Sequence, residues 1–259
     1  MLKYFLILLS LIASLKINSQ DTLVLKLNPK FKVVNEKKAT ITRQVIKSDS
    51  IYLIKDFSKS NVLLMTSECS KYDPMIENGK SAYYNDDGSK IGEGNYKNGL
   101  MFGKWILHTK GKADTIDYTK AYEYYINIDK VESLTALNKC DEMPLFKGSS
   151  DLKKFINYVE NRVYYPPRSI YYLKTAKVEI QFTVDNMGKV VNPKILSPID
   201  KDMELESIRV LLKSPKWTPG KNNGDLVNVN FKRVCNYIVL CKNVWGLDRM
   251  FQNHYFDRT

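Results

Sequence analysis

Residue types that could carry catalysis are few in this chain, and they are widely spaced. The two histidines, His108 and His254, lie far apart in the sequence, and neither flanks an obvious nucleophile. Glu204 and Glu206 stand two residues apart on a predicted helix, so their carboxylates point to different faces and do not form a pair. We interpret both as part of a solvated acidic first turn. The sequence therefore predicts a protein that is not an enzyme and uses no cofactor.

The cysteines and the glycine-containing stretches give no pattern typical of a metal or phosphate site. The cysteines show no CxxC spacing, and with only two histidines in the chain no zinc site is predicted. In an oxidising compartment the cysteines could form disulfides in any of three pairings, and free thiols are the alternative. The "GKS" of residues 79–81 lacks the earlier glycine of a phosphate loop, so no small-molecule substrate is predicted. The four cysteines are Cys69, Cys140, Cys235 and Cys241.

The chain is basic, with a formal net charge of +12 and a pI of about 9.3. Such a balance suits anionic partners in general. The lysines are spread along the chain instead of being clustered on one predicted helix. This distribution favours a basic solvated surface over a nucleic-acid-binding role.

The first residues are typical of an export signal. Lys3 precedes an apolar run from Tyr4 to Leu15, which is too short to span a bilayer comfortably. We expect residues 1–20 to be a signal peptide, with an uncleaved anchor as the alternative. The protein is then exported to the periplasm, where it is free or peripheral to the inner or outer membrane.

Residues 21–138 are typical of a β-rich repeat region. Segments such as "SAYYNDDGSKIGEGNYKNG" place aromatic and β-branched residues on both sides of turns rich in Asp, Asn and Gly. Downstream of "YKNG", Gly103, Lys104 and Trp105 resemble the "G-x-W" element of MORN-like hairpins. That resemblance implies stacked hairpins with no catalytic role.

The periodicity changes after a boundary at residues 139–147. Leu152, Phe155, Ile156 and Val159 give a helical stripe, and Val178 to Val184 alternates as a half-buried strand. A "DNMG" turn then leads into a second strand over 190–196. A second helix covers "DKDMELESIRVLLK", and a long alternating strand follows to residue 241. The predicted order is α-β-β-α-β, and the predicted fold class is α+β.

The stretch "SPKWTPGKNNG" at residues 214–224 connects the second helix to the last strand. Pro215 stops the helix, and Asn223-Gly224 favours a tight turn. We expect Trp217 to pin this corner onto the core, since a large aromatic side chain buries a large apolar area.

Residues 139–241 resemble a TonB C-terminal domain. The residues that carry the resemblance are "MPLFKGSSDLKKFI", "YYPP", "VEIQFTVDNMGKVVNPKIL", "LESIRVLLKSPKWTPGKNNG" and "VNVNF", in that order. The resemblance implies a three-stranded antiparallel sheet backed by helices. It also implies a protein-binding module of TonB-dependent transmembrane transport.

The resemblance further implies a mode of binding. An extended peptide of an outer-membrane TonB-dependent receptor, or of another envelope protein, pairs with the edge of the last strand by β-augmentation. A homodimer through the same edge is a further option. The implied partner-binding residues are Tyr165, Pro166, Val227, Val229, Phe231, Arg233, Cys235, Tyr237 and Val239.

The sequence departs from that family in ways that leave an alternative open. It has a signal-like segment where transducers have an anchor, it lacks a Pro-rich spacer, and Val234 stands where the last strand usually has a proline. The alternative is a structural or immunity-type envelope repeat protein without an energy-transduction role, in which the hairpin region makes the main contact.

Several surface residues have two interpretations. Lys216, Lys221, Lys232 and Arg233 could steer an acidic peptide, or could only prevent unwanted strand pairing. The tail, residues 242–259, could dock on the body or bind a partner. Four tyrosines could form a binding rim or pack half-buried with their hydroxyls in water; they are Tyr164, Tyr165, Tyr171 and Tyr172.

Overall fold

A computed structural model gives the fold, and it describes residues 22–109, 111–131, 134–240 and 250–252. The predicted signal peptide and all but three residues of the aromatic tail lie outside the described residues. Among the described residues, no helix is long and apolar enough to cross a membrane. The fold class is α+β, as the sequence predicts.

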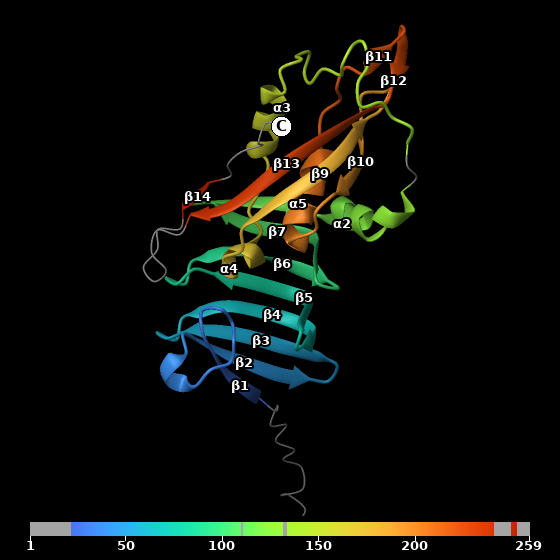
Figure 1. Cartoon of the computed structure of the whole chain (residues 1–259). Helices are drawn as coiled ribbons and strands as arrows, with labels where there is room; N and C mark the ends of the chain where they lie inside the picture. Colours follow the sequence, from blue (N-terminus) through green and yellow to red (C-terminus); the bar gives the residue numbers. More distant parts are fainter. Residues whose placement is uncertain (1–21, 110, 132–133, 241–249, 253–259) are drawn as a thin grey trace, which may run out of the picture.

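The N-terminal half is one eight-stranded antiparallel sheet, in which each strand pairs with the next strand in the chain. Asn98 and Gly99, with φ values of 52° and 76°, close the hairpin between its sixth and seventh strands. The strands run in order along the molecule, as Figure 1 shows in blue to green. They are β1 (Thr22–Leu27), β2 (Ile41–Ser48), β3 (Ile51–Ser58), β4 (Leu63–Tyr72), β5 (Met75–Tyr84), β6 (Lys90–Lys97), β7 (Leu100–Thr109) and β8 (Lys112–Asp117).

Trp105 on β7 is the main anchor of these hairpins. Its side chain is fully buried, and its Nε1–H donates to the carbonyl of Asn95 at 3.0 Å. The indole lies directly over Gly94, where a Cβ atom would stand 2.3 Å from the ring. Residue 94 on β6 must therefore be glycine, because a side chain there would clash with the indole of Trp105 on β7. The likeness of these hairpins to MORN repeats stays a prediction.

A helix interrupts the region that the sequence analysis assigned to strands and turns alone. Helix α2 (Thr119–Ile126) follows β8 directly and buries Ala121 and Tyr122. Short 3-10 turns, η1 (Glu36–Lys38) and η2 (Ile128–Lys130), flank the sheet and this helix. Contacts join α2 to the later helix α5 (Lys201–Leu212). Tertiary packing therefore stabilises a short helix whose local sequence, rich in Tyr, has only average helix propensity.

The C-terminal half contains the predicted α-β-β-α-β order with additions. A second short helix starts at Pro167, and a small hairpin precedes the last long strand. The short strand β14 pairs with the end of that strand. Besides α5, the elements are α3 (Lys153–Glu160), α4 (Pro167–Tyr171), β9 (Ala176–Val184), β10 (Val190–Ile195), β11 (Gly220–Asn222), β12 (Asp225–Val227), β13 (Val229–Leu240) and β14 (Met250–Gln252).

Trp217 does pin the corner between α5 and the last strand. It is 3% exposed, and its backbone N–H donates to the carbonyl of Gly188 at 2.8 Å. The indole Nε1–H donates to the Ser214 hydroxyl at 3.1 Å. Four phenylalanine rings surround it, with ring centroids 4.9–6.3 Å away; they are Phe146, Phe155, Phe182 and Phe231.

The two halves pack against each other, and their buried side chains form one continuous hydrophobic core. Helix α5 contacts β7 and α2, while α4 contacts β5 and β6. In Figure 1 the sheet of β9, β10 and β13 lies beyond β7, at the end of the ladder opposite β1. We call the contact between the hairpin sheet and helices α4 and α5 the junction.

Candidate partner-binding edge and the junction behind it

Strand β13 provides the candidate binding edge. The strand order of its sheet is β10-β9-β13-β14. Residues 229–237 of β13 pair with β9, in an unbroken antiparallel register from Val229↔Val184 to Tyr237↔Ala176. Only Ile238–Leu240 pair with β14. Among the described residues, the outer side of β13 is therefore unpaired over residues 231–237.

The chain's own linker occupies the start of that outer side. Leu137 forms a parallel bridge with Val229: its N–H donates to the Asn228 carbonyl at 2.9 Å, and its carbonyl accepts from the Asn230 N–H at 2.8 Å. The side-chain amide of Asn228 also donates to the carbonyl of Thr135 at 3.1 Å. A short extended segment is thus already held by main-chain pairing at this edge, which is the mode expected for a partner.

These contacts fix which main-chain groups face outward. The N–H and C=O groups of successive strand residues point to opposite sides, and those of Asn228 and Asn230 point to the linker. Because the register with β9 is unbroken, Lys232 and Val234 also direct their main-chain groups outward. The odd-numbered residues direct theirs to β9. The predicted partner-binding set leaves out Asn230, Lys232 and Val234, because side-chain alternation does not reveal on which side of a strand its neighbour lies.

Three of the predicted partner-binding residues of β13 have side chains in the core, and the role of the predicted set in binding stays a prediction. Val229, Phe231 and Cys235 are buried, at 0%, 6% and 5% exposure. Burial raises the pKa of the Cys235 thiol to about 12. Val227 belongs to β12 and pairs with Gly220 of β11. Tyr237 and Val239 lie in β13, but their side chains are outside the described residues.

Tyr165 and Pro166 lie away from solvent at the start of α4. Tyr165 is 6% exposed, and its hydroxyl donates to the carbonyl of Lys174. Tyr171, the last residue of α4, and Tyr172 after it also pack inward: their rings contact Phe31 of the hairpin half in tilted and edge-to-face arrangements, at 5.3 and 4.6 Å between ring centroids. The role of Tyr165 and Pro166 in binding stays a prediction.

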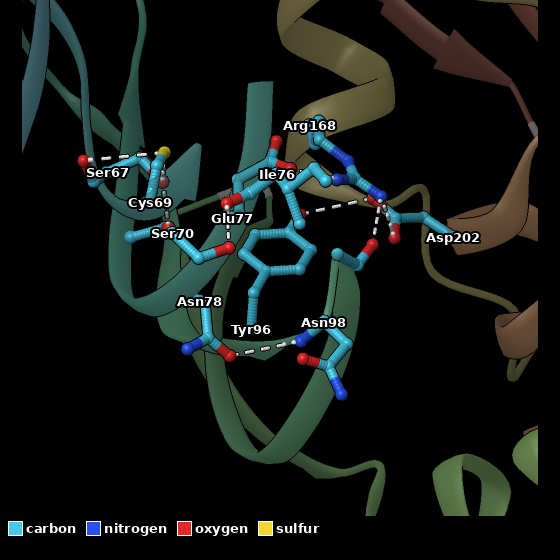
Figure 2. A network of polar contacts seen from close by, with 12 residues as sticks. Ser67, Cys69, Ser70, Ile76, Glu77, Asn78, Tyr96, Asn98, Arg168 and Asp202 are labelled. Atoms are coloured by element: carbon cyan, nitrogen blue, oxygen red, sulfur yellow. Dashed lines mark hydrogen bonds and ion pairs between the residues drawn. The ribbon is translucent and has the colours of Figure 1, made fainter. Parts of the chain in front are cut away.

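The junction centres on Arg168, and Figure 2 shows its contacts. Its guanidinium binds Asp202 of α5 through Nε and Nη2 at 2.8 and 2.7 Å. Nη1 meets Glu77 of β5 at 2.7 Å, and Nη2 donates to the Gly99 carbonyl at 2.9 Å. The ring of Tyr96 lies 4.5 Å from the guanidinium, and its hydroxyl donates to Asp202 at 3.1 Å. One arginine therefore joins α4, α5 and two hairpins.

The carboxylates of this cluster are buried, and burial disfavours their ionised forms. Asp202 is 0% exposed and Glu77 is 3% exposed. Burial raises the pKa of Asp202 to about 6, although the charge of Arg168 favours its ionised form. The ion pair offsets the desolvation of the carboxylates only while Arg168 stays in place.

A second cluster joins α4 to the outer hairpins. Arg43 binds Asp56 through two hydrogen bonds of 2.8 and 2.7 Å, and the hydroxyl of Tyr171 donates to the same carboxylate at 2.6 Å. Asp56 has no exposed surface. Burial, reinforced by the nearby Asp56 charge, raises the pKa of Tyr171 well above its usual value, so the hydroxyl stays a donor.

The interpretation of Glu204 and Glu206 as solvated residues is wrong. They are 2% and 0% exposed, because α2 and β7 cover the face of α5 that would otherwise meet water. Glu206 forms an ion pair of 2.6 Å with Arg209. Glu204 accepts from the Tyr125 hydroxyl at 2.7 Å. The two carboxylates do face different partners, as their spacing predicts.

Nothing in the described part of the chain groups residues for metal binding: no three His, Cys, Asp or Glu side chains converge. Within the same ranges Cys69, Cys140 and Cys235 are free thiols. Burial raises the pKa of the Cys69 thiol to about 12, which keeps it protonated at neutral pH. The fourth cysteine, Cys241, lies outside the described residues.

Comparison with known proteins gives a family match within the C-terminal half. Residues 161–239 match the family model described as the Gram-negative bacterial TonB protein C-terminal. The match covers α4 to β13 and thus includes both the junction helices and the candidate edge. No match was found among curated proteins or among solved structures. The resemblance drawn from the sequence is confirmed for these residues, and the hairpin sheet lies outside the match.

Proposed function

We infer that this chain is a TonB-like protein of the cell envelope, and that it captures an extended segment of an outer-membrane TonB-dependent receptor, or of a related envelope protein, at the outer side of β13. The family match supports the envelope role. The capture mode rests on one observation: β13 directs unpaired main-chain groups outward next to a segment, 135–138, that already pairs there.

Main-chain pairing explains how such a site binds without a pocket. A captured strand obtains its affinity from N–H and C=O groups of Lys232 and Val234, while side chains on its two faces give selectivity. The core beneath β13 holds this edge straight, because Phe231 stacks on Phe182 of β9 at 5.5 Å between ring centroids. Because the edge is already ordered, binding does not include the cost of ordering it.

A proline at residue 232 tests this proposal. Lys232→Pro removes the N–H that faces outward and leaves the hydrogen bonds to β9 in place. We expect it to weaken the binding of synthetic peptides from the N-terminal plugs of TonB-dependent receptors at least about tenfold, as loss of one to two hydrogen bonds would. Fluorescence anisotropy of labelled peptides measures this.

Lys232→Ala is the matched control, because it removes the side chain and keeps the N–H. It should bind within about threefold of the wild type, and both variants should show cooperative thermal unfolding. Val229→Pro is unsuitable, since the N–H of Val229 faces β9. If the proline and alanine variants bind equally, edge capture is refuted. That result would favour the alternative in which the hairpin sheet makes the main contact.

A further inference from the structure

Arg233 is a cation on the candidate edge strand that lacks a carboxylate partner among the described residues. Its side chain is half-buried on the same face of β13 as Phe231, whose ring centroid lies 5.7 Å from the guanidinium carbon. The printed hydrogen bond of the guanidinium runs from Nη1 to the carbonyl of Lys232 at 2.6 Å. Burial lowers the pKa of Arg233, and no neighbouring charge offsets that effect.

The other cations of this region differ from Arg233. Lys232 lies 3.6 Å from Glu179 on the opposite face of the sheet, and Lys221 lies 3.4 Å from Glu142. Lys216 is exposed to solvent. Desolvating an arginine without a counter-charge is costly, and proteins usually pair such groups. Arg233 is thus the cation of this set whose environment calls for an anion.

The guanidinium also lies where a captured strand must come. The Lys232 carbonyl faces outward, since it is two residues from the linker-bound Asn230. It is therefore a group that a captured strand would use as an acceptor, and Arg233 now occupies it. A residue paired directly with Arg233 would project its side chain on the same face as Arg233, within about 5.5 Å between Cβ atoms.

We propose that the captured segment carries an aspartate or glutamate opposite Arg233. Its carboxylate replaces the Lys232 carbonyl as the acceptor of the guanidinium, in a geometry that arginine and carboxylate can satisfy with two hydrogen bonds. The carbonyl so released accepts an N–H of the captured strand. This inference rests on the proposed function and adds to it the chemistry that selects the partner.

A position scan tests the inference on the full chain. One labelled, non-repetitive peptide of about ten residues carries a single Glu, moved one position at a time, and a second series carries Gln instead. We expect the Glu peptide of the best register to bind about 10- to 100-fold more tightly than its Gln counterpart, the range for a hydrogen bond to a charged group. Affinity along the scan should alternate, because alternate side chains share the face of Arg233.

Variants of Arg233 and Lys232 separate this effect from general charge attraction. Arg233→Gln should abolish the preference for Glu over Gln, and Arg233→Glu should prefer a Lys peptide. Lys232→Gln, which also removes one positive charge, should keep the preference. Equal binding of Glu and Gln peptides to the wild type, or a preference that survives Arg233→Gln, overturns the inference.

Failure of the proposed function gives a different result. If no peptide of either series binds to the wild type, or if Lys232→Pro binds every peptide as the wild type does, edge capture is wrong and the inference fails with it. If Glu and Gln peptides bind the wild type equally and Lys232→Pro weakens the binding of both, edge capture stands and the carboxylate alone is refuted.

Discussion

The two sides of the C-terminal half differ in whether their polar groups have partners within the protein. At the junction, carboxylates that are 0–3% exposed meet arginines and tyrosine hydroxyls at 2.6–3.1 Å. In the part of the chain that the structure describes, no strand lies beside the outer side of β13 over residues 231–237, and no carboxylate pairs with Arg233. A surface whose polar groups are satisfied needs no partner. A surface that leaves them unsatisfied gains from one.

The difference also indicates how the halves depend on each other. The matched region, residues 161–239, includes Arg168 and Asp202, whose third partner Glu77 lies in the hairpin sheet. Removing the hairpin sheet would expose the Arg168–Asp202 pair to water and would take away Glu77, the third member of the cluster. The hairpin sheet therefore completes the domain, while the edge of β13 stays available on another side.

The largest expected difference is in the rate of thiol labelling, between Cys69 in the hairpin sheet and Cys140 near the segment that pairs with β13. Cys69 on β4 is fully buried, and burial holds the pKa of its thiol near 12. Cys140 lies half-exposed in the segment beside the edge. With iodoacetamide at pH 8, Cys140 should react at least about a thousandfold faster than Cys69, because Cys69 reacts only after opening of the fold. Peptide mass mapping over time measures both rates, and similar rates would mean that the hairpin side opens readily.

Arg168→Met is expected to be the most damaging of the single substitutions considered. It leaves Glu77 and Asp202 buried without their cation, which should lower the free energy of unfolding by about 3–5 kcal/mol. Urea denaturation measures this. Arg162→Met is the control, since Arg162 is exposed and should change stability by less than about 0.5 kcal/mol.

The pH dependence of the Arg168→Met variant has a defined sign. Burial already raises the pKa of Asp202 to about 6, above its unfolded value of about 4, and losing Arg168 raises it further. A carboxyl group with a raised folded pKa stabilises the fold below its unfolded pKa, and that contribution is lost as the pH rises through the folded pKa. The variant should therefore be more damaged at pH 8 than at pH 5. A defect that shrinks as the pH rises would contradict this account.

Tyr171→Phe tests the second junction cluster. It removes the hydroxyl donor to buried Asp56 but leaves both hydrogen bonds from Arg43. We expect a loss of roughly 1–3 kcal/mol in thermal or urea unfolding. Tyr164→Phe is the matched control, because its hydroxyl donates to Asp114, which is only half-buried, and its loss should matter less. Equal losses for the two variants would remove the distinction between fully buried and half-buried acceptors.

Arg233→Gln should have the smallest effect on folding. Arg233 has no charged partner within residues 22–109, 111–131, 134–240 and 250–252, so the free energy of unfolding should stay within about 0.5 kcal/mol of the wild type. Thermal unfolding measures the change. A loss as large as that of Tyr171→Phe would show that Arg233 supports the fold and would place it with the junction residues.

Much of the fold follows from local sequence. Turn residues such as Asn98-Gly99 mark the hairpins, and apolar periodicity marks α3, α5 and the β9–β10 hairpin. The burial of Trp217 was predicted from its position between two prolines. These features depend on neighbours along the chain, which is why a single sequence reveals them.

The rest depends on contacts between distant segments. Glu206 lies on what would be the polar face of α5, yet it is fully buried, and its carboxylate accepts from the main-chain N–H of the distant Tyr164 at 2.8 Å. Helix α2 and the pairing of Leu137 with β13 have no local signal. Alternation along β13 predicted which side chains enter the core, but the outward main-chain groups of Lys232 follow only from the register with β9.

The stacked order of the hairpins has a mechanical consequence. Eight strands about 4.8 Å apart place β1 roughly 34 Å from β8, so the sheet acts as a spacer between its first strand and the C-terminal domain. The hydrogen bonds of antiparallel ladders run across the strands, along the direction of that spacing. A tension applied from end to end would load seven ladders in series, and the weakest would open first. We therefore expect the hairpin half to set a distance under low load and to resist a strong pull poorly.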